Sequence, residues 1–191
     1  MLHFLFFAAA CNNDPAPTLE PSKARIAEAK AYCQRMGMNQ SVVFFLDMQQ
    51  HSGLNRFMVY DCAQNKVIHR FPVSHGCGGM LWSLTTSKKN PTFSNEDGSH
   101  CSSLGKYKIG ERAYSQWGVH TKYVLHGLEA SNSNALKRTI VLHSWEQVPD
   151  AEVYPDGTPE GWGCPAISND NFTLIDPILK RASKPVLLWM Y

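Results

Sequence analysis

The chain has 191 residues, enough for one domain with a sizeable core and a short additional segment. Its hydrophobic content of 43% and charged content of 18% are ordinary for a folded domain and argue against disorder. The formal net charge is only +2, and no run of Lys and Arg is longer than Lys88-Lys89, so nothing favours a nucleic-acid partner. The sequence contains no stretch of about eighteen apolar residues, which excludes an ordinary membrane-spanning helix.

The beginning of the chain has the features of an export signal. Residues 1–10 read MLHFLFFAAA, an apolar run that ends in small residues directly before Cys11. Ala-Ala-Ala-Cys resembles a bacterial lipobox, in which the cysteine becomes the lipid-acylated N-terminus. No Lys or Arg precedes the apolar run, and a buried N-terminal segment is the alternative. We expect a signal peptide and lipobox over 1–11, a flexible proline-rich tether over 12–21, and one domain over 22–191.

After the tether, the sequence predicts a mainly β domain with short helices. Ser22 can cap a first helix rich in Ala, Lys, Arg and Glu, and Gly37 is a natural stop. From Ser41 the apolar residues come in short β-type runs. Helical segments are expected at 23–36, 132–136 and, interrupted by Pro177, 172–181. Strands are expected at 42–46, 56–60, 66–73, 105–110, 123–127, 139–142 and 186–191.

The stretch from 140 to 167 has the strongest chemical signal. An apolar run ends on His143, a polar loop follows, and the stretch closes on a Gly-Trp-Gly-Cys-Pro turn with Cys164 as its cysteine. Cysteine chemistry needs a nearby imidazole to take the thiol proton. The glycines let the backbone turn sharply and point N–H groups at a developing oxyanion. The alternative is a structural cysteine in a tight turn, because cysteine is usually a buried small hydrophobe.

This stretch resembles the active-site signature of the L,D-transpeptidase (YkuD-type) superfamily. It is most similar to the murein L,D-transpeptidase catalytic domain family, whose signature reads Ser-Trp-Gly-Cys-Pro-Ala, and residues 162–166 match its last five positions. Cys164 stands at the position of the nucleophile and His143 at that of the general base. Residues 102–109 are similar to the family's Thr-Pro-x-Gly-x-Tyr-x-Ile strand. Gly161 stands where most members of the family carry Ser or Thr, and Ser144 stands where Gly is commoner. The resemblance extends from about 42 to 191.

The resemblance implies a YkuD-type β-sandwich, preceded here by the N-terminal helix, that acts on peptidoglycan stem tetrapeptides. Cys164 would form a thioester with the donor stem, His143 would shuttle the proton, and N–H groups near Gly163 would hold the oxyanion. A second stem would then accept the acyl group and give a 3→3 crosslink. The resemblance implies no cofactor and no metal, and we expect a monomer in the bacterial envelope, lipid-anchored with its domain in the periplasm.

Further positions are assigned by their place in these motifs. We expect Trp162, His126 and Tyr107 to contact the substrate, although His126 could also be a core or supporting histidine. Ser144 follows the base, and its backbone carbonyl is a candidate to fix the imidazole tautomer. We expect the Cys164 sulfur and a ring nitrogen of His143 within about 4 Å or one water apart, and a thiol pKa depressed below about 8.5.

Five other cysteines need an interpretation. Ser74-His75-Gly76-Cys77 imitates the wider superfamily's nucleophile motif, but it lies too early in the fold, so Cys77 is treated as a decoy. With Cys11 acylated and Cys164 free, Cys33, Cys62, Cys77 and Cys101 could pair in three ways, of which Cys77–Cys101 is favoured because these two flank the long 81–103 loop. No zinc-type spacing occurs.

Two other functions remain open at this stage. One is an L,D-carboxypeptidase or related murein hydrolase that uses the same Cys/His chemistry with water as the acceptor. The other is a catalytically silent wall-binding lipoprotein in which Cys164 is only structural. The 81–103 loop would influence the choice of acceptor, because loops of this length commonly bind ligands or act as lids.

Overall fold

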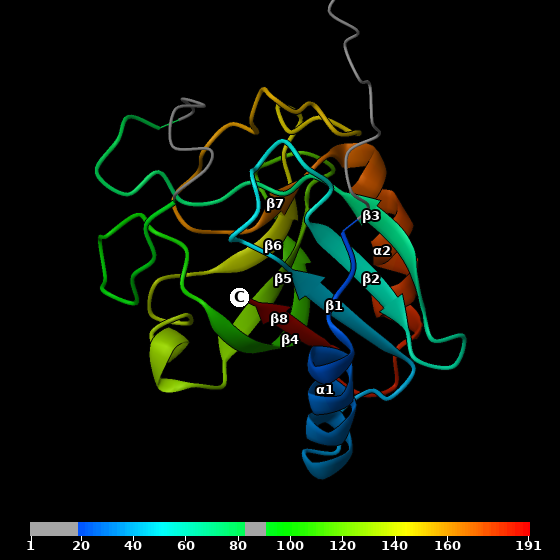
Figure 1. The fold of residues 1–191 in the computed structure, drawn as a ribbon. Coiled ribbons are helices and arrows are strands. Elements are labelled where there is room, and N and C mark those ends of the chain that lie inside the picture. The colour runs from blue at the N-terminus through cyan, green and yellow to red at the C-terminus, as the bar shows by residue number, and fades with distance from the viewer. Residues whose placement is uncertain (1–18, 83–90) are drawn as a thin grey trace, which may run out of the picture.

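The computed structural model describes residues 19–82 and 91–191 (Figure 1). The predicted signal peptide, Cys11 and most of the predicted tether lie outside the described residues. Two helices, one 3₁₀ turn and eight strands make up the described chain. The helical elements are α1 (Lys23–Arg35), η1 (Ala130–Asn132) and α2 (Asn169–Arg181). The strands are β1 (Val42–Leu46), β2 (Phe57–Asp61), β3 (Lys66–Phe71), β4 (Gly105–Tyr114), β5 (Thr121–Gly127), β6 (Val141–Ser144), β7 (Ala166–Ile167) and β8 (Leu187–Met190).

All eight strands belong to one sheet with the order β3-β2-β1-β8-β4-β5-β6-β7. The C-terminal strand β8 lies in its middle, parallel to β1 and antiparallel to β4. The chain that follows β3 returns to β7 at the other edge, where the N–H of Ser74 donates to the carbonyl of Ala166 at 2.8 Å. The sheet is therefore nearly closed, and β6 and β7, which carry the chemical signal, lie next to this closure.

Apolar residues fill both faces of the sheet. The larger cluster collects residues from every part of the sheet and from α2, including Phe44, Leu142 and Phe172. The smaller cluster lies between the other face and α1, and includes Phe45 and Cys33. Strand β1 is buried at all five positions because alternate residues serve the two clusters. An unbroken apolar run is what a strand covered on both faces requires.

The predicted fold class is confirmed, and the predicted elements differ from the observed ones mainly at their ends. Ser22 caps α1 by accepting a hydrogen bond from the N–H of Arg25 at 3.2 Å. Helix α2 begins at Asn169, three residues before the predicted start, because Ser168 caps it, and it continues through Pro177. Strand β4 extends to Tyr114 through an irregular register after Ile109. No described helix is long and apolar enough to cross a bilayer.

The end of the predicted tether is docked on the domain. Leu19 packs against the smaller cluster, and its carbonyl accepts a hydrogen bond from Arg70 at 3.1 Å. Glu20 forms an ion pair with the same arginine, and Pro21 is buried. Residues 19–21 therefore belong to the folded unit, because they already bury apolar surface before α1 begins.

Candidate active site

Strand β6 places the side chain of His143 at the edge of the hydrophobic core. Successive side chains of a strand point to opposite faces, so Leu142 is fully buried in the larger cluster while His143 is half-buried. The imidazole Nδ1 lies 2.9 Å from the backbone carbonyl oxygen of Ser144. A carbonyl can only accept, so Nδ1 carries the proton and Nε2 keeps its lone pair. The carbonyl predicted to fix the tautomer is in place.

His143 is neutral near pH 7. Burial lowers its pKa below the ordinary value of 6.5, and the neighbouring charge of Lys122 on β5 lowers it further, whereas the hydrogen bond to Ser144 and the charge of Glu146 raise it. Lys122 stands directly opposite His143 in the β5–β6 ladder. A neutral ring with a free Nε2 can accept a proton, which is the property a general base needs.

The turn before Cys164 requires glycine at Gly163. Its φ of +101° is one that residues with a side chain rarely adopt, and a Cβ there would lie 2.4 Å from the carbonyl oxygen of Cys101. The hydroxyl of Ser102 donates to the carbonyl of Gly163 at 3.1 Å. The turn is thus pressed against residues 101–102 from a distant part of the chain, and this contact fixes the position of the cysteine.

The sulfur of Cys164 is held by the backbone that leads into β6. The N–H of Val141 lies 3.4 Å from Sγ, and the carbonyl of Thr139 lies 3.8 Å from it. Thr139 has a φ of +56°, a strained conformation for a β-branched residue. Such strain persists only where the surrounding structure enforces it, and here it turns the carbonyl towards the sulfur.

The expected depression of the thiol pKa is wrong. Burial raises the pKa of Cys164 above its ordinary value of 9.0, although the N–H of Val141 and the charges of Arg138 and Lys122 lower it. Desolvation disfavours the thiolate more than these groups favour it. Among the described residues, Cys164 and His143 form no hydrogen bond with each other. The resting pair is therefore a neutral thiol and a neutral imidazole.

Cys164 and His143 both border two cavities. One, of about 150 Å³, is termed the aromatic pocket. The other, of about 360 Å³, is termed the lysine pocket. Besides the shared pair and Trp117, the aromatic pocket is lined by Ser74, Trp82, Trp145, Gly161, Trp162 and Ala166. The lysine pocket is lined by Tyr114, Ser115, Gln116, Lys122, Thr139 and Val141. A reacting group at Sγ could thus be approached from two chemically different sides.

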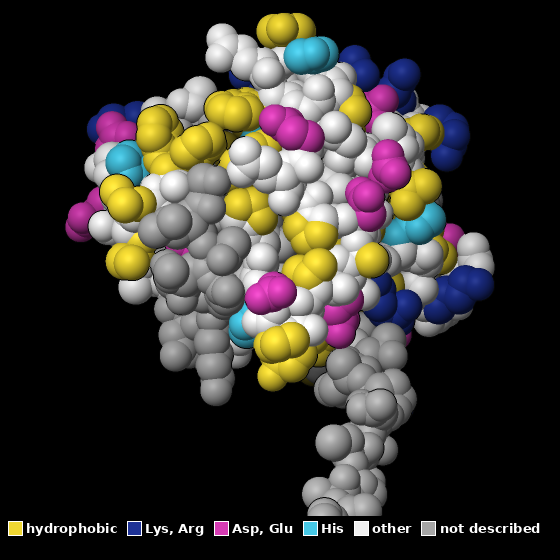
Figure 2. All heavy atoms as spheres, turned by 90° about the horizontal axis from the view of Figure 1, so that it is seen from above, with side chains coloured by type: hydrophobic (Ala, Val, Ile, Leu, Met, Phe, Trp, Pro, Cys, Tyr) yellow, Lys and Arg dark blue, Asp and Glu magenta, His cyan; other side chains and the backbone are white. Residues whose placement is uncertain are grey.

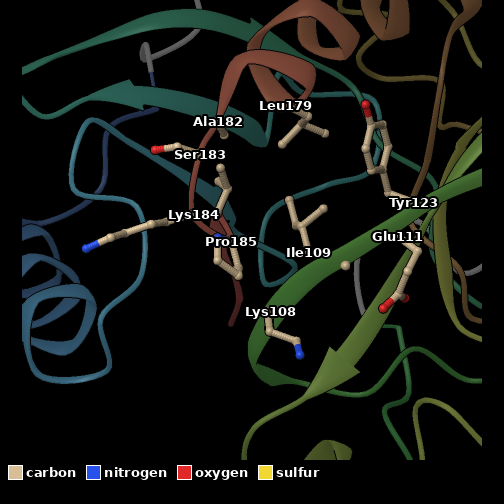
Figure 3. Close-up of a pocket in the computed structure, with 11 residues that line it drawn as sticks. Lys108, Ile109, Glu111, Tyr123, Leu179, Ala182, Ser183, Lys184 and Pro185 are labelled. Atoms are coloured by element: carbon tan, nitrogen blue, oxygen red, sulfur yellow. The ribbon is translucent and has the colours of Figure 1, made fainter.

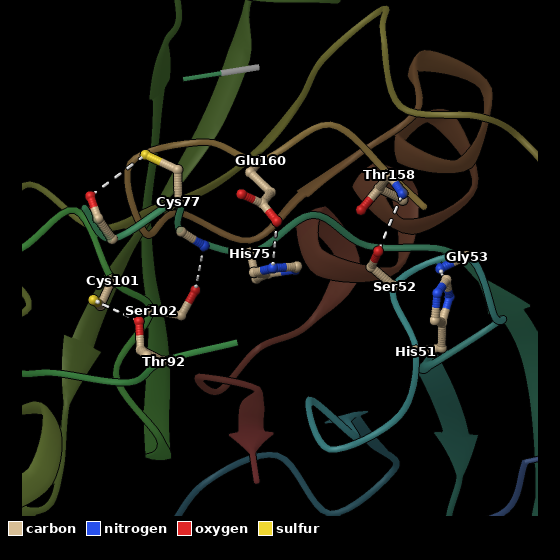
Figure 4. A network of polar contacts seen from close by, with 12 residues as sticks. His51, Ser52, Gly53, His75, Cys77, Thr92, Cys101, Ser102, Thr158 and Glu160 are labelled. Atoms are coloured by element: carbon tan, nitrogen blue, oxygen red, sulfur yellow. Dashed lines mark hydrogen bonds and ion pairs between the residues drawn. The ribbon is translucent and has the colours of Figure 1, made fainter. Parts of the chain in front are cut away.

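The loop that leads to the Cys164 turn is anchored by a buried polar network (Figure 4). His75 accepts a hydrogen bond from Arg56 at 2.9 Å and contacts Glu160 at 3.2 Å, all three side chains being buried. The backbone of Gly161 pairs with the same segment, donating to the carbonyl of His75 and accepting from the N–H of Cys77. Residues 160–161 are therefore held immediately before Trp162, which limits how far the turn can move.

The backbone N–H groups of Gly163 and Cys164 donate to no group within residues 19–82 and 91–191. Backbone N–H groups left unpaired beside a nucleophile are the usual components of an oxyanion hole. The turn therefore carries two backbone donors without partners at and beside the cysteine.

The chain matches a known protein family. The sequence model of the L,D-transpeptidase catalytic domain matches residues 17–191. The chain belongs to the L,D-transpeptidase catalytic domain family. No curated protein matches the sequence.

Two solved structures are similar to this family member. The L,D-transpeptidase from Xylanimonas cellulosilytica aligns with a TM-score of 0.45 at 10% identity, over 84% of this chain and 68% of that one. The helical cell shape determining protein Pgp2 from Campylobacter jejuni aligns with a TM-score of 0.49 at 11% identity, over 78% of this chain and 47% of that one. This L,D-transpeptidase domain thus spans about half the length of Pgp2.

Two residues predicted to contact substrate line neither pocket of this L,D-transpeptidase domain. Tyr107 is fully buried in the core, where its hydroxyl donates to the carbonyl of Ser103 at 2.7 Å. His126 faces Glu111 on the neighbouring strand at 3.1 Å and lines neither pocket. The sequence placed both on the correct strands but could not show which face of the sheet each side chain occupies. Trp162, by contrast, borders the aromatic pocket, 61% exposed and stacked on His100.

The decoy cysteine is separated from the site. Cys77 is buried, donates to the carbonyl of Gly78, and lines neither pocket that Cys164 borders. The disulfide favoured between Cys77 and Cys101 is not formed, and all five described cysteines are free thiols. Cys101 instead lies 3.5 Å from the hydroxyl of Thr92 (Figure 4).

A separate open groove of about 360 Å³ runs between β4 and the α2–β8 connection (Figure 3). Its lining includes Lys108, Glu111, Leu179 and Lys184 but none of the residues predicted to be catalytic. It therefore lies apart from the site that Cys164 and His143 form.

Several residues of the active-site region gave no signal in the sequence. Trp82, Trp117 and Trp145 come from three segments that only the fold brings together. Lys122 was hidden inside a strand, and Gly118 packs so tightly that a Cβ there would lie 2.6 Å from the carbonyl oxygen of Ser144. An isolated tryptophan or glycine carries no positional information, so sequence reasoning had nothing with which to select them.

Proposed function

We propose that this domain is a cysteine-dependent peptidoglycan L,D-transpeptidase that acts on stem tetrapeptides and forms 3→3 crosslinks. The observation that carries the proposal is that Cys164 and His143 border the same two pockets, the imidazole being fixed by Ser144 with Nε2 available. Family membership supports the reaction class, and the geometry supports the assignment of roles.

The first half-reaction is acylation of the cysteine. The Cys164 sulfur attacks the carbonyl carbon of the third, L-centred residue of the donor stem, and its proton passes to Nε2 of His143. Because both groups are neutral at rest, proton transfer accompanies attack rather than preceding it. The oxyanion accepts hydrogen bonds from the N–H groups of Gly163 and Cys164. The C–N bond to the terminal D-Ala then breaks, and the leaving amine takes the proton from His143.

The second half-reaction resolves the thioester. The amine of a second stem attacks the thioester carbonyl, gives its proton to His143, and the sulfur leaves with that proton as the Cys164 thiol. The lysine pocket supports the entry of charged stem ends on one side, since Lys122 can attract a carboxylate there. Water as the acceptor would give the carboxypeptidase outcome with the same residues.

The deciding experiment is mass spectrometry of a disaccharide-tetrapeptide incubated with the purified protein. A crosslinked dimer with release of D-Ala is the expected product. A tripeptide without a dimer would identify a carboxypeptidase, and unchanged substrate would leave only a wall-binding role. Cys164→Ser is the matched control, since it changes a single atom of the proposed nucleophile and should abolish either product.

We also propose that the mature protein is anchored through lipid on Cys11 and faces the periplasm. The support is the apolar, alanine-ended run before Cys11, together with a folded domain that begins near residue 19 and so leaves a short connection. Cys11→Ser should move the protein from the membrane fraction to the soluble fraction. Wild-type protein that is already soluble and retains Met1 would contradict the anchor.

A further inference from the structure

The side chain of Arg138 holds a distant segment of the chain in place. Arg138 lies in the connection between η1 and β6 and is half-buried. Its guanidinium donates hydrogen bonds of 2.5 to 3.3 Å to four oxygens of one segment, the carbonyls of Ser94 and Cys101 and the hydroxyls of Ser99 and Ser103. The planar fork of arginine has five donors and suits this number of acceptors, whereas a lysine ammonium has only three donors at one point.

The segment that Arg138 holds is the one against which the Cys164 turn is packed. A Cβ on Gly163 would lie 2.4 Å from the carbonyl oxygen of Cys101, which is the oxygen that Arg138 binds at 2.5 Å. The next residue, Ser102, donates its hydroxyl to the carbonyl of Gly163 at 3.1 Å. Arg138 therefore fixes the surface on which the turn of the nucleophile rests.

The backbone that follows Arg138 contacts the sulfur directly. The carbonyl of Thr139 lies 3.8 Å from Sγ of Cys164, and the N–H of Val141 lies 3.4 Å from it. The N–H of Arg138 donates to the carbonyl of Asn134 at 2.8 Å, which ties the start of this stretch to the preceding turn. The side chain of Arg138 thus supports one flank of the nucleophile, and the backbone after Arg138 forms the other flank.

The positive charge of Arg138 is not neutralised by an acid. Within residues 19–82 and 91–191 it forms no ion pair, and the four acceptors of its guanidinium are uncharged. A Cβ on Gly163 would lie 3.3 Å from a guanidinium nitrogen, so the charge stands beside the turn itself. No Asp or Glu is among the described residues that line either pocket of the site. A half-buried charge is screened less than an exposed one and favours negative charge that develops nearby.

The charge of Arg138 acts on the sulfur of Cys164. Burial raises the pKa of this thiol, and a backbone hydrogen bond and the charges of Arg138 and Lys122 lower it. The titratable side chains near the sulfur include His143, which is neutral, and Tyr107, whose pKa burial raises to about 12. Figure 2 shows Lys and Arg side chains in separate groups rather than in one basic patch on the face that it displays. The lowering is therefore a local effect of two charges.

We propose that Arg138 is the positioning residue of the nucleophile, which holds the 94–103 segment and the 139–141 backbone around Cys164 and stabilises negative charge at its sulfur. The inference deepens the proposed function, on which it rests for the role of Cys164. Arg138 lines neither pocket, so it acts through the turn and through its charge rather than by contact with the substrate. During acylation the sulfur gives its proton to His143 as it bonds to the carbonyl carbon. The charge of Arg138 favours the negative charge that develops on the sulfur and on the oxyanion beside it.

The test compares two cysteine reagents of similar size, neutral iodoacetamide and anionic iodoacetate, from each of which the sulfur displaces iodide. The ratio of their rate constants at Cys164, followed by mass spectrometry, cancels differences in thiolate fraction and in access, so it reports the charge beside the sulfur. Arg138→Gln should lower the ratio of iodoacetate to iodoacetamide rates about threefold, and Arg138→Lys should retain the wild-type ratio. Lys23→Gln removes an equal charge from an exposed position on α1, outside both pockets, and should change nothing.

Hydrogen exchange measures the positioning role separately. The amide N–H groups of residues 94–103 should exchange faster in both Arg138→Gln and Arg138→Lys than in the wild type, because each variant loses donors of the fork. Unchanged exchange in both variants would overturn the positioning role. A wild-type reagent ratio in Arg138→Gln, or equally lowered ratios in the two variants, would overturn the role of the charge. If Arg138→Gln does not fold, Arg138→Met is the second neutral variant, and a lowered ratio in folded Arg138→Lys still rejects the role of the charge.

The outcomes separate this proposal from the proposed function, because alkylation needs no substrate. A protein that releases no D-Ala from a disaccharide-tetrapeptide, but whose reagent ratio falls in Arg138→Gln, would reject the proposed function and keep the assignment of Arg138. Release of D-Ala by a protein in which Arg138→Gln changes neither the ratio nor the exchange would keep the proposed function and reject the assignment of Arg138.

Discussion

The imidazole Nδ1 of His143 lies 2.9 Å from the backbone carbonyl oxygen of Ser144, the next residue in the chain. This contact requires no further side chain, and it leaves Nε2 as the only ring nitrogen able to take a proton. The carbonyl of Ser144 must itself be held in position, and residues 118–119 of the neighbouring segment hold it. The Ser144 hydroxyl accepts a hydrogen bond from the N–H of Val119 at 2.9 Å, and Gly118 packs directly against the same residue.

Gly118→Ala should impair catalysis by displacing this carbonyl. A Cβ at Gly118 would lie 2.0 Å from the Ser144 hydroxyl and 2.6 Å from its carbonyl oxygen, and the φ of +54° is unfavourable for alanine. Because small misplacements at a catalytic group can cost about 10²-fold, we expect a loss of that order in turnover of a disaccharide-tetrapeptide. Gly79→Ala is the control, since a Cβ there meets nothing within 4 Å. Equal activity in the two variants would contradict the positioning role.

Alkylation of Cys164 by iodoacetamide should be slow near neutral pH. Burial raises the thiol pKa above 9.0, so the thiolate fraction, which governs the rate, is still increasing at pH 9. The rate should rise about tenfold per pH unit between pH 7 and 9, followed by mass spectrometry of the Cys164 peptide. A plateau reached already at pH 7 would show a preformed thiolate–imidazolium pair, which the structure does not contain.

The acid limb of activity should lie below pH 6.5. Burial lowers the pKa of His143, so its ring stays neutral and able to accept a proton at pH 6.5, where an ordinary histidine is half protonated.

The lowered pKa of folded His143 also means that the unfolded chain binds this proton more readily than the folded protein does. The histidine therefore contributes stability that is present above pH 6.5 and is lost as pH falls through the lower folded value. The acid limb is measured from the pH dependence of kcat/KM, and the loss of stability from urea titrations at several pH values. The His143→Gln variant should show neither the acid limb nor this loss of stability.

Adduct mapping should distinguish the two cysteines that carry similar sequence signals. A carbapenem, the inhibitor class implied by the family resemblance, should acylate Cys164 in the wild type and in Cys77→Ala but not in Cys164→Ala. Cys77 is buried and lines neither pocket of the site, so it has no access to the reagent. An adduct found on Cys77 in native protein would reverse the assignment of the nucleophile.

Thr139→Gly should stabilise the protein. The φ of +56° is strained for a β-branched residue and free for glycine, and relief of the strain outweighs the larger entropy glycine loses on folding. We expect a gain of about 1 kcal/mol in the free energy of unfolding, measured by urea titration. Asn65, at a φ of +51° in the β2–β3 hairpin, is the comparison. Asparagine tolerates this conformation, so Asn65→Gly should gain less. A Thr139→Gly protein less stable than wild type would mean that no strain is stored there.

The sequence by itself determined the class of fold and selected the two residues proposed to react. Short apolar runs predict strands, and the unbroken run at β1, which a strand covered on both faces requires, agrees with the structure residue for residue. Ser22 acts as the predicted cap because a side-chain oxygen can serve the free N–H groups of the next turn. His143 and Cys164 were found because their motif is local, with one residue ending a strand and the other following two glycines.

Only the tertiary structure decided what surrounds that pair. Tyr107 was expected at the substrate and lies in the core, because the face of a strand that turns inward depends on its neighbours in the sheet. Burial reversed the expected direction of the thiol pKa, and burial is a property of the whole packed structure rather than of the spacing between two residues. Trp82, Trp117 and Trp145 meet at one corner although more than twenty residues separate each from the next. Contacts across such separations are set by the order of strands in the sheet, which local patterns do not encode.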